Sequence, residues 1–117
     1  MKYYKLVVFT DGTREAYQKI TAMLGVKPVE EDEYDVWTYL VEEHEKSPAF
    51  DFINEFLDLL EPRLEKLEEV GITRDNVLFW LLYEYEHQCA LGFNPQELQR
   101  LGASGISLNI DCWEPKK

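Results

Sequence analysis

Apolar side chains repeat at every second position along residues 76–89, which hold the densest aromatic and aliphatic content of the chain. Strand side chains point alternately to two faces, so this spacing predicts a strand with one face buried along its length. A helix is disfavoured, because helical spacing would bring Glu84 and Glu86 among the apolar positions. The opposite face begins with an apolar patch that needs a cover, from the same chain or from a second subunit. This patch consists of Leu78, Trp80 and Leu82.

Three more strands and three helices follow from the same kind of pattern. Alternation with β-branched and aromatic content predicts strands over residues 3–10, 36–41 and 106–113. Apolar stripes at helical spacing, with capping residues Thr13, Ser47 and Asn94 before them, predict helices over residues 14–24, 48–70 and 95–101. Pro62 lies inside the second stripe, so we expect a kink or two helices meeting near Glu61.

The order of these elements predicts an α+β fold. The central and last strands carry a polar or charged face for part or all of their length, which disfavours a sheet covered by helices on both sides. We expect a two-layer α/β sandwich, with one mixed sheet of about four strands and helices mainly on one face. The 117 residues contain no repeat or linker, so residues 1–117 are expected to form a single domain.

The chain is strongly acidic, with 12 Lys and Arg against 23 Asp and Glu and a net charge of −11. This charge repels phosphate backbones and anionic lipid, so it disfavours nucleic acid and membranes as partners, and a basic protein fits better. The sequence shows no signal peptide or membrane span, so a cytoplasmic location is expected. It also indicates no cofactor. Cys89 and Cys112 lack a metal-type spacing and are expected to be free thiols packed as small hydrophobic residues.

Short motifs of apolar residues, glycine and proline occupy segments 24–28, 59–62, 93–98, 101–103 and 108–113. These motifs resemble those of a family of small, mostly bacterial proteins known as domain of unknown function four-two-seven-nine. The chain departs from the family pattern at Val29, where a threonine usually stands, and in lacking a glycine before Trp37. The resemblance implies a single small α+β domain with no established activity.

Acidic residues at the end of the central strand are the first candidate for chemistry. Glu84 and Glu86 share a strand face and, with His87 and with Asp111 from the last strand, could form a metal site or an acid/base site. The competing interpretation is an exposed strand end whose charges keep the protein soluble. We favour it because structural ion pairs shift the pKa values of acidic side chains just as catalytic sites do.

A second group of acids predicts a docking surface. Glu31 and Glu33 lie in an acidic loop, Glu42 and Glu43 end the second strand, and Trp113 is a candidate interface anchor. We therefore expect a non-catalytic protein-binding domain that docks a basic partner, with an immunity-type inhibitor of a basic nuclease toxin as a specific version. A small metal-binding or hydrolytic enzyme is the alternative, and a homodimer formed through the apolar patch is a third hypothesis.

Overall fold

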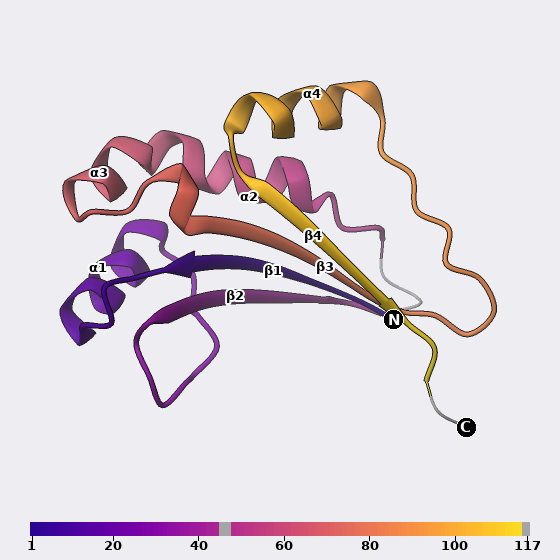
Figure 1. The fold of residues 1–117 in the computed structure, drawn as a ribbon, viewed down its shortest axis with the longest axis horizontal. Helices are drawn as coiled ribbons and strands as arrows, with labels where there is room; N and C mark the ends of the chain where they lie inside the picture. Colours follow the sequence, from indigo (N-terminus) through magenta and orange to yellow (C-terminus); the bar gives the residue numbers. More distant parts are fainter. Residues whose placement is uncertain (45–47, 116–117) are drawn as a thin grey trace.

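The computed structural model describes residues 1–44 and 48–115, which form an α+β fold with a single four-stranded sheet (Figure 1). The strands are β1 (Lys2–Phe9), β2 (Val36–Glu43), β3 (Val77–Glu84) and β4 (Ser107–Trp113). Their order is β2-β1-β3-β4; β1 is antiparallel to both of its neighbours, and β3 is parallel to β4. The predicted mixed sheet and the interior position of β3 are confirmed.

The helices form a second layer on one face of this sheet (Figure 1). They are α1 (Arg14–Leu24), α2 (Phe52–Leu60), α3 (Leu64–Glu69) and α4 (Pro95–Ser104), with short 3-10 turns η1 (Glu61–Arg63) and η2 (Arg74–Asn76). Parallel strands need a crossover connection, and residues 85–94 with α4 supply it between β3 and β4. The two-layer sandwich predicted from the sequence is therefore the observed architecture. In the described part of the chain, no helix is long and apolar enough to span a bilayer.

Two of the three predicted helix starts are confirmed. Thr13 Oγ1 accepts the Ala16 N–H at 3.1 Å, and Asn94 Oδ1 accepts the Glu97 N–H at 2.8 Å. These bonds satisfy amide groups that have no partner within the first helical turn. The third prediction is wrong: Asp51 caps α2, and the predicted cap Ser47 lies outside the described residues.

The late start of α2 has a tertiary cause. The Phe50 N–H donates to Glu43 Oε1 at 2.6 Å, and the Phe50 ring packs on Tyr4 with centroids 5.3 Å apart. These contacts hold Phe50 against the sheet outside any helix, so helical geometry begins only after Asp51. At the other end of α2 the predicted break near Glu61 is confirmed, because α2 stops at Leu60 and Pro62 occupies the following 3-10 turn.

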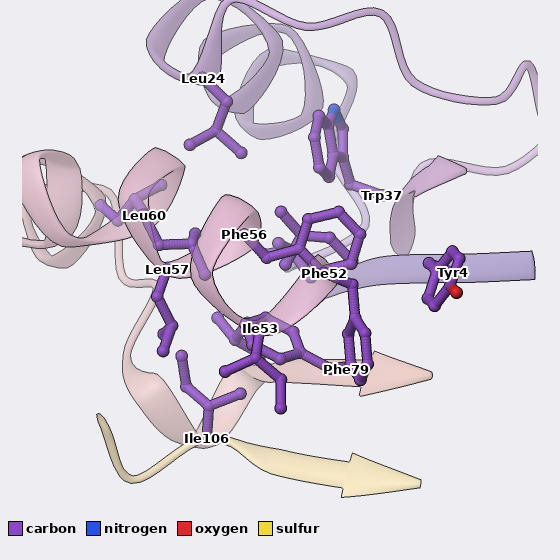
Figure 2. Close-up of a cluster of buried hydrophobic side chains, with 14 of the residues drawn as sticks. Tyr4, Leu24, Trp37, Phe52, Ile53, Phe56, Leu57, Leu60, Phe79 and Ile106 are labelled. Carbon is purple, nitrogen blue, oxygen red and sulfur yellow. The ribbon is translucent and has the colours of Figure 1, made fainter. Parts of the chain in front are cut away.

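The core lies between the sheet and the helices and is rich in aromatic rings (Figure 2). Phe56 of α2 meets Phe79 of β3 edge to face, with centroids 5.3 Å apart. Trp37 is fully buried against α1, where its Nε1–H donates to Thr21 Oγ1 at 3.0 Å. The sheet presents every second residue to this core, as alternation requires. These residues are Tyr4, Leu6, Val8, Trp37, Val77, Phe79 and Leu81.

The central strand is shorter than its sequence pattern suggests. β3 ends at Glu84, whereas alternation predicted a strand to Cys89. Beyond Glu84 the chain leaves the sheet, and the connector 85–94 packs Leu91 and Phe93 against the core. Burial of these two side chains outweighs continued strand pairing, so Glu86 and His87 belong to a connector rather than to a strand.

Candidate functional site: the open face of the sheet

The candidate site is the face of the sheet that points away from the helices, here called the open face. It consists of the strand positions whose side chains alternate with those of the core. Its apolar members are Tyr3, Val7 and Phe9 of β1, Val36 and Leu40 of β2, Leu78, Trp80 and Leu82 of β3, and Trp113 of β4. The predicted apolar patch of β3 is thus the middle of a wider apolar surface.

No helix of the described chain covers the open face (Figure 1). Phe9 is 44% exposed and Trp113 is 37% exposed, which are high values for large apolar side chains. Only the smaller side chains Val7 and Thr38 are buried there, between their neighbours on adjacent strands. A contiguous apolar surface of this kind is typical of an interaction site.

The register of the strands sets the geometry of the open face. Lys5 of β1 lies opposite Leu40 of β2 on one side and opposite Trp80 of β3 on the other. It is the only basic residue among the sixteen strand positions of this face. The rings of Tyr3 and Trp113 stack across β3, with centroids 6.5 Å apart and planes within 11°. The face therefore has an aromatic pair at one end and a single cation near its centre.

Carboxylates surround this apolar surface. Glu42 stands on the edge strand β2, Asp111 on the edge strand β4, and both are exposed. Glu31, from the loop before β2, lines a shallow hollow of about 430 Å³ on the open face together with Lys5 and Asp111. Because edge strands bound the sheet, these acids form a rim, and charge on a rim steers an approaching partner.

Of the predicted docking residues, Glu43 was assigned wrongly. Its side chain faces the helix layer, where Oε1 accepts the Tyr4 hydroxyl at 2.9 Å and the Phe50 amide at 2.6 Å. Lys2 Nζ lies 3.8 Å from Oε2, and the Glu43 side chain is only 13% exposed. Burial, with the nearby Glu43 carboxylate, raises the pKa of Tyr4 well above its ordinary value. Glu42 and Glu43 are adjacent in sequence, so strand alternation sends them to opposite faces.

The other predicted docking residues are all on the surface. Glu31 and Glu42 belong to the rim, and Trp113 projects from the open face with its ring on Tyr3. Glu33 is exposed in the loop before β2, but it does not line the hollow on the open face. Three of the five predicted residues therefore lie on or beside the open face, with Glu31 at the hollow and Glu42 and Trp113 near Tyr3.

The predicted metal ligands are not brought into one cluster. Glu84, Glu86 and His87 line a hollow of about 680 Å³ at the end of β3, whereas Asp111 lines the hollow on the open face. Across β3 and β4, Asp111 is in register with Leu82, and Trp113 takes the position beside Glu84. Within residues 1–44 and 48–115, no three His, Cys, Asp or Glu side chains are placed to hold a metal ion. This corrects the proposed four-residue site.

The two cysteines are free thiols, as expected, but they are not buried in the core. Cys89 is exposed in the connector, Cys112 is half-buried on β4, and their Sγ atoms are 2.8 Å apart. The sequence predicted that each would pack against the sheet as a small hydrophobic residue, and it gave no indication that the two would meet. Their separation of 23 positions carries no motif, and the contact arises because the connector turns back over the end of β4.

Sequence reasoning missed the β1 and β2 members of the open face, above all Lys5, Phe9 and Leu40. Alternation within each strand places these residues on one face of that strand, but it does not say which face points toward the helices.

Comparison with known proteins adds no information, since no family model, curated protein or solved structure matches the chain. The resemblance to family four-two-seven-nine stays a prediction.

Proposed function

We propose that this chain is a non-catalytic protein-binding domain that docks a basic protein on the open face. The observation that carries the proposal is an uncovered apolar surface with an acidic rim, built on the four-stranded sheet. Protein interfaces combine an apolar centre with a polar rim, and complementary charge on the rim raises the association rate. The partner should present apolar side chains ringed by Lys and Arg.

Charge favours a basic partner over a second copy of the chain. Each copy carries −11, and a face-to-face dimer would bring two acidic rims together around Glu31, Glu42 and Asp111. Like charges that meet across an interface cost several kcal/mol, on the order of the stability of a weak dimer. Lys5 offers one positive charge per copy, too few to offset this repulsion.

An immunity-type inhibitor of a basic nuclease is the specific version of this proposal. A nuclease binds a polyanion, so an acidic rim around an apolar centre can occupy the same cationic surface as the substrate. Stoichiometric inhibition of DNA or RNA cleavage by a captured partner would support it. A captured basic partner without nuclease activity removes this version and leaves the docking proposal in place.

The test is capture from a lysate of the source cell at low salt with three forms of the protein. The rim variant E31Q/E42Q/D111N neutralises three carboxylates, and the control E65Q/E68Q/E69Q makes the same charge change on the exposed side of α3. We expect the wild type and the control to retain a basic protein that a salt ramp releases, and the rim variant to lose it.

A second pair of variants tests the apolar centre. W113S removes a 37% exposed ring from the open face, whereas L98S removes a 52% exposed side chain from α4 in the helix layer. W113S should weaken capture about 10-fold or more, as expected for an aromatic anchor, and L98S should leave it unchanged. Equal capture by open-face and helix-layer variants, or self-association alone in sedimentation, contradicts the proposal.

A further inference from the structure

The Cys89 and Cys112 thiols form a second site that is separate from the open face. Cys112 shares its strand parity with Leu108 and Ile110, so it lies on the helix side of the sheet, and Cys89 comes to it from the connector 85–94. The two sulfur atoms touch at 2.8 Å. A shift of less than about 1 Å would bring them to the bond length of a disulfide, roughly 2.05 Å.

Contacts on both sides of the pair hold this arrangement. The Tyr85 N–H donates to the Trp113 carbonyl at 3.0 Å, which fixes the start of the connector to the end of β4. Leu91 and Phe93, at the other end of the connector, pack against the core. Cys112 itself is held in register with Tyr83 of β3. The thiols are therefore preorganised rather than brought together by chance encounters of a free loop.

We propose that Cys89 and Cys112 are a reactive dithiol that is converted to an intramolecular disulfide by exchange with a small disulfide such as oxidised glutathione. The Cys89 thiolate attacks one sulfur of glutathione disulfide, forms a mixed disulfide and releases one glutathione thiolate, which takes up a proton. Cys112 then loses its proton and attacks the Cys89 sulfur, which closes the protein disulfide and releases the second glutathione. The two protein thiols lose two electrons, and glutathione disulfide is reduced to two glutathione thiols.

The surroundings of the two thiols assign this order of attack. The hydrogen bond with Cys89, together with partial burial and the neighbouring charges, raises the pKa of Cys112 to about 11. Cys89 is the exposed member of the pair and Cys112 is half-buried on β4, so the first attack on a small disulfide falls to Cys89. Once Cys89 carries glutathione, the adjacent Cys112 resolves the mixed disulfide.

The test exposes the purified, reduced protein to oxidised glutathione and follows it by intact mass and by counting free thiols. The wild type should lose two hydrogen atoms and both thiols, and should stay a monomer on a non-reducing gel. C112S should stop at the mixed disulfide, with one added glutathionyl group, because it lacks the resolving thiol. The mixed-disulfide fraction of the wild type should be at least about 10-fold lower than that of C112S, since the resolving thiol acts at a high effective concentration.

Two outcomes would overturn the inference. In one, both wild-type thiols remain open to alkylation in fully oxidised glutathione; in the other, the wild type accumulates the same glutathione adduct as C112S. C89S serves as the matched variant and should react more slowly than C112S, because its remaining thiol, Cys112, is half-buried on β4, whereas Cys89 is exposed. A circular dichroism spectrum of each variant shows that the fold is retained. The proposal does not depend on the docking function, because none of these readouts involves a partner.

Discussion

Glu42 and Glu43 are neighbours in the chain but belong to different parts of the molecule. Glu42 is exposed on the open face, while Glu43 accepts two hydrogen bonds on the helix side of the sheet. We expect E43A to lower the free energy of unfolding by about 2 kcal/mol, because it leaves the Tyr4 hydroxyl and the Phe50 amide without their charged acceptor. E42A should change it by less than about 0.5 kcal/mol. Urea unfolding of both variants checks this difference, and equal losses would contradict it.

Tyr4 is expected to make the protein sensitive to alkaline pH. Its ring is 3% exposed, and burial together with Glu43 raises the pKa of its hydroxyl, whereas an unfolded tyrosine titrates near pH 10. Above that pH the unfolded chain loses this proton and the folded chain keeps it. The unfolded state then binds fewer protons, so the free energy of unfolding falls as the pH rises.

The variant Y4F isolates this effect. It keeps the ring contacts with Phe50 and Phe52, whose centroids lie 5.3 and 5.1 Å away, but it removes the titrating group. Its stability should fall less steeply than that of the wild type above about pH 10, with a slope difference of at most about 1.4 kcal/mol per pH unit. Urea titrations at several alkaline pH values measure this slope. Parallel slopes for the two proteins would show that Tyr4 does not contribute.

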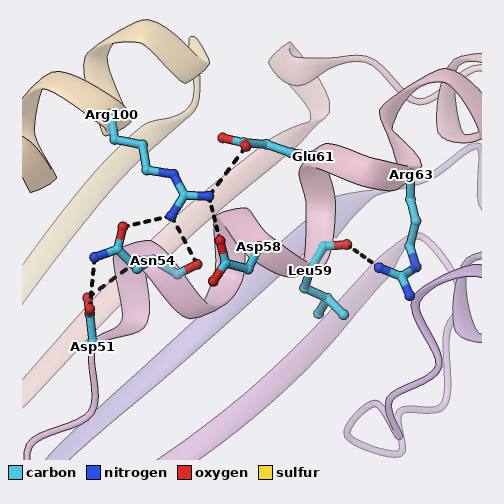
Figure 3. Close-up of polar contacts among 7 residues, drawn as sticks. All are labelled: Asp51, Asn54, Asp58, Leu59, Glu61, Arg63 and Arg100. Atoms are coloured by element: carbon cyan, nitrogen blue, oxygen red, sulfur yellow. Dashed lines mark hydrogen bonds and ion pairs between the residues drawn. The ribbon is translucent and has the colours of Figure 1, made fainter.

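At the scale of elements, two arginines tie the helices together in different ways (Figure 3). Arg63 Nε donates to the Met23 carbonyl at 2.7 Å and Nη1 donates to the Leu59 carbonyl at 2.9 Å, so it joins the C-terminal ends of α1 and α2. Arg100 of α4 reaches α2 instead, where it bonds Asn54 Oδ1 at 2.7 Å and Asp58 Oδ1 at 2.6 Å. Helix-end carbonyls lack partners within the helix, so Arg63 satisfies groups that would otherwise be unpaired.

We expect R63A to destabilise the protein more than R100A. Loss of Arg63 should cost about 2 kcal/mol, because it removes charged donors from partly buried carbonyls. The charged partners of Arg100 are largely open to solvent, with Asp58 68% and Glu61 47% exposed, so R100A should cost less than about 1 kcal/mol. Thermal and urea unfolding of the two variants side by side give the ranking. The reverse order would mean that the ion pairs of α4 matter more than the capping of α1 and α2.

At the scale of the whole molecule, the cysteine pair offers a way to change stability without substitution. Cys89 and Cys112 are 23 positions apart and enclose α4 and most of β4. A disulfide that closes a loop of this length is expected to raise the free energy of unfolding by about 3 kcal/mol, mainly by restricting the unfolded chain. The midpoint of urea unfolding should therefore be higher for the oxidised protein than for the reduced protein.

The double variant C89S/C112S is the control for this prediction. It should unfold at the same urea concentration in oxidising and reducing buffers, near the midpoint of the reduced wild type, because serine replaces each thiol with little change in size. An oxidised wild type no more stable than the reduced form would indicate that closing the bond strains β4 or the connector. That result would count against the preorganised geometry of the pair.

Much of the fold could be predicted because its causes are local. Thr13 and Asn94 cap helices through bonds to amides three residues away, and Pro62 ends α2 because it cannot continue the helix. The start of α2 and the end of β3 were predicted wrongly because distant contacts decide them. Phe50 is held by Glu43, and the connector leaves the sheet so that Leu91 and Phe93 pack against the core.

The candidate site was less predictable than the fold. Alternation identified the β3 patch and its need for a cover, and composition identified the excess of acid. Neither pattern could assign Glu43 to the helix side of the sheet or place Lys5 beside Trp80. These relations depend on which strands are neighbours and on their register. The acids grouped as metal ligands separated for the same reason, because Asp111 pairs across the sheet with Leu82.

By itself the sequence determined the elements, their order, the two-layer class and the net charge of −11, because propensity, periodicity, capping and charge act within a few residues or simply add up. Only the tertiary structure decided which sheet face stays open, which carboxylates form its rim and that Cys89 meets Cys112. Those features require residues far apart in the chain to become neighbours. Packing of the helices on one side of the sheet sets that arrangement, because burial of the aromatic core outweighs the local preferences of any single segment.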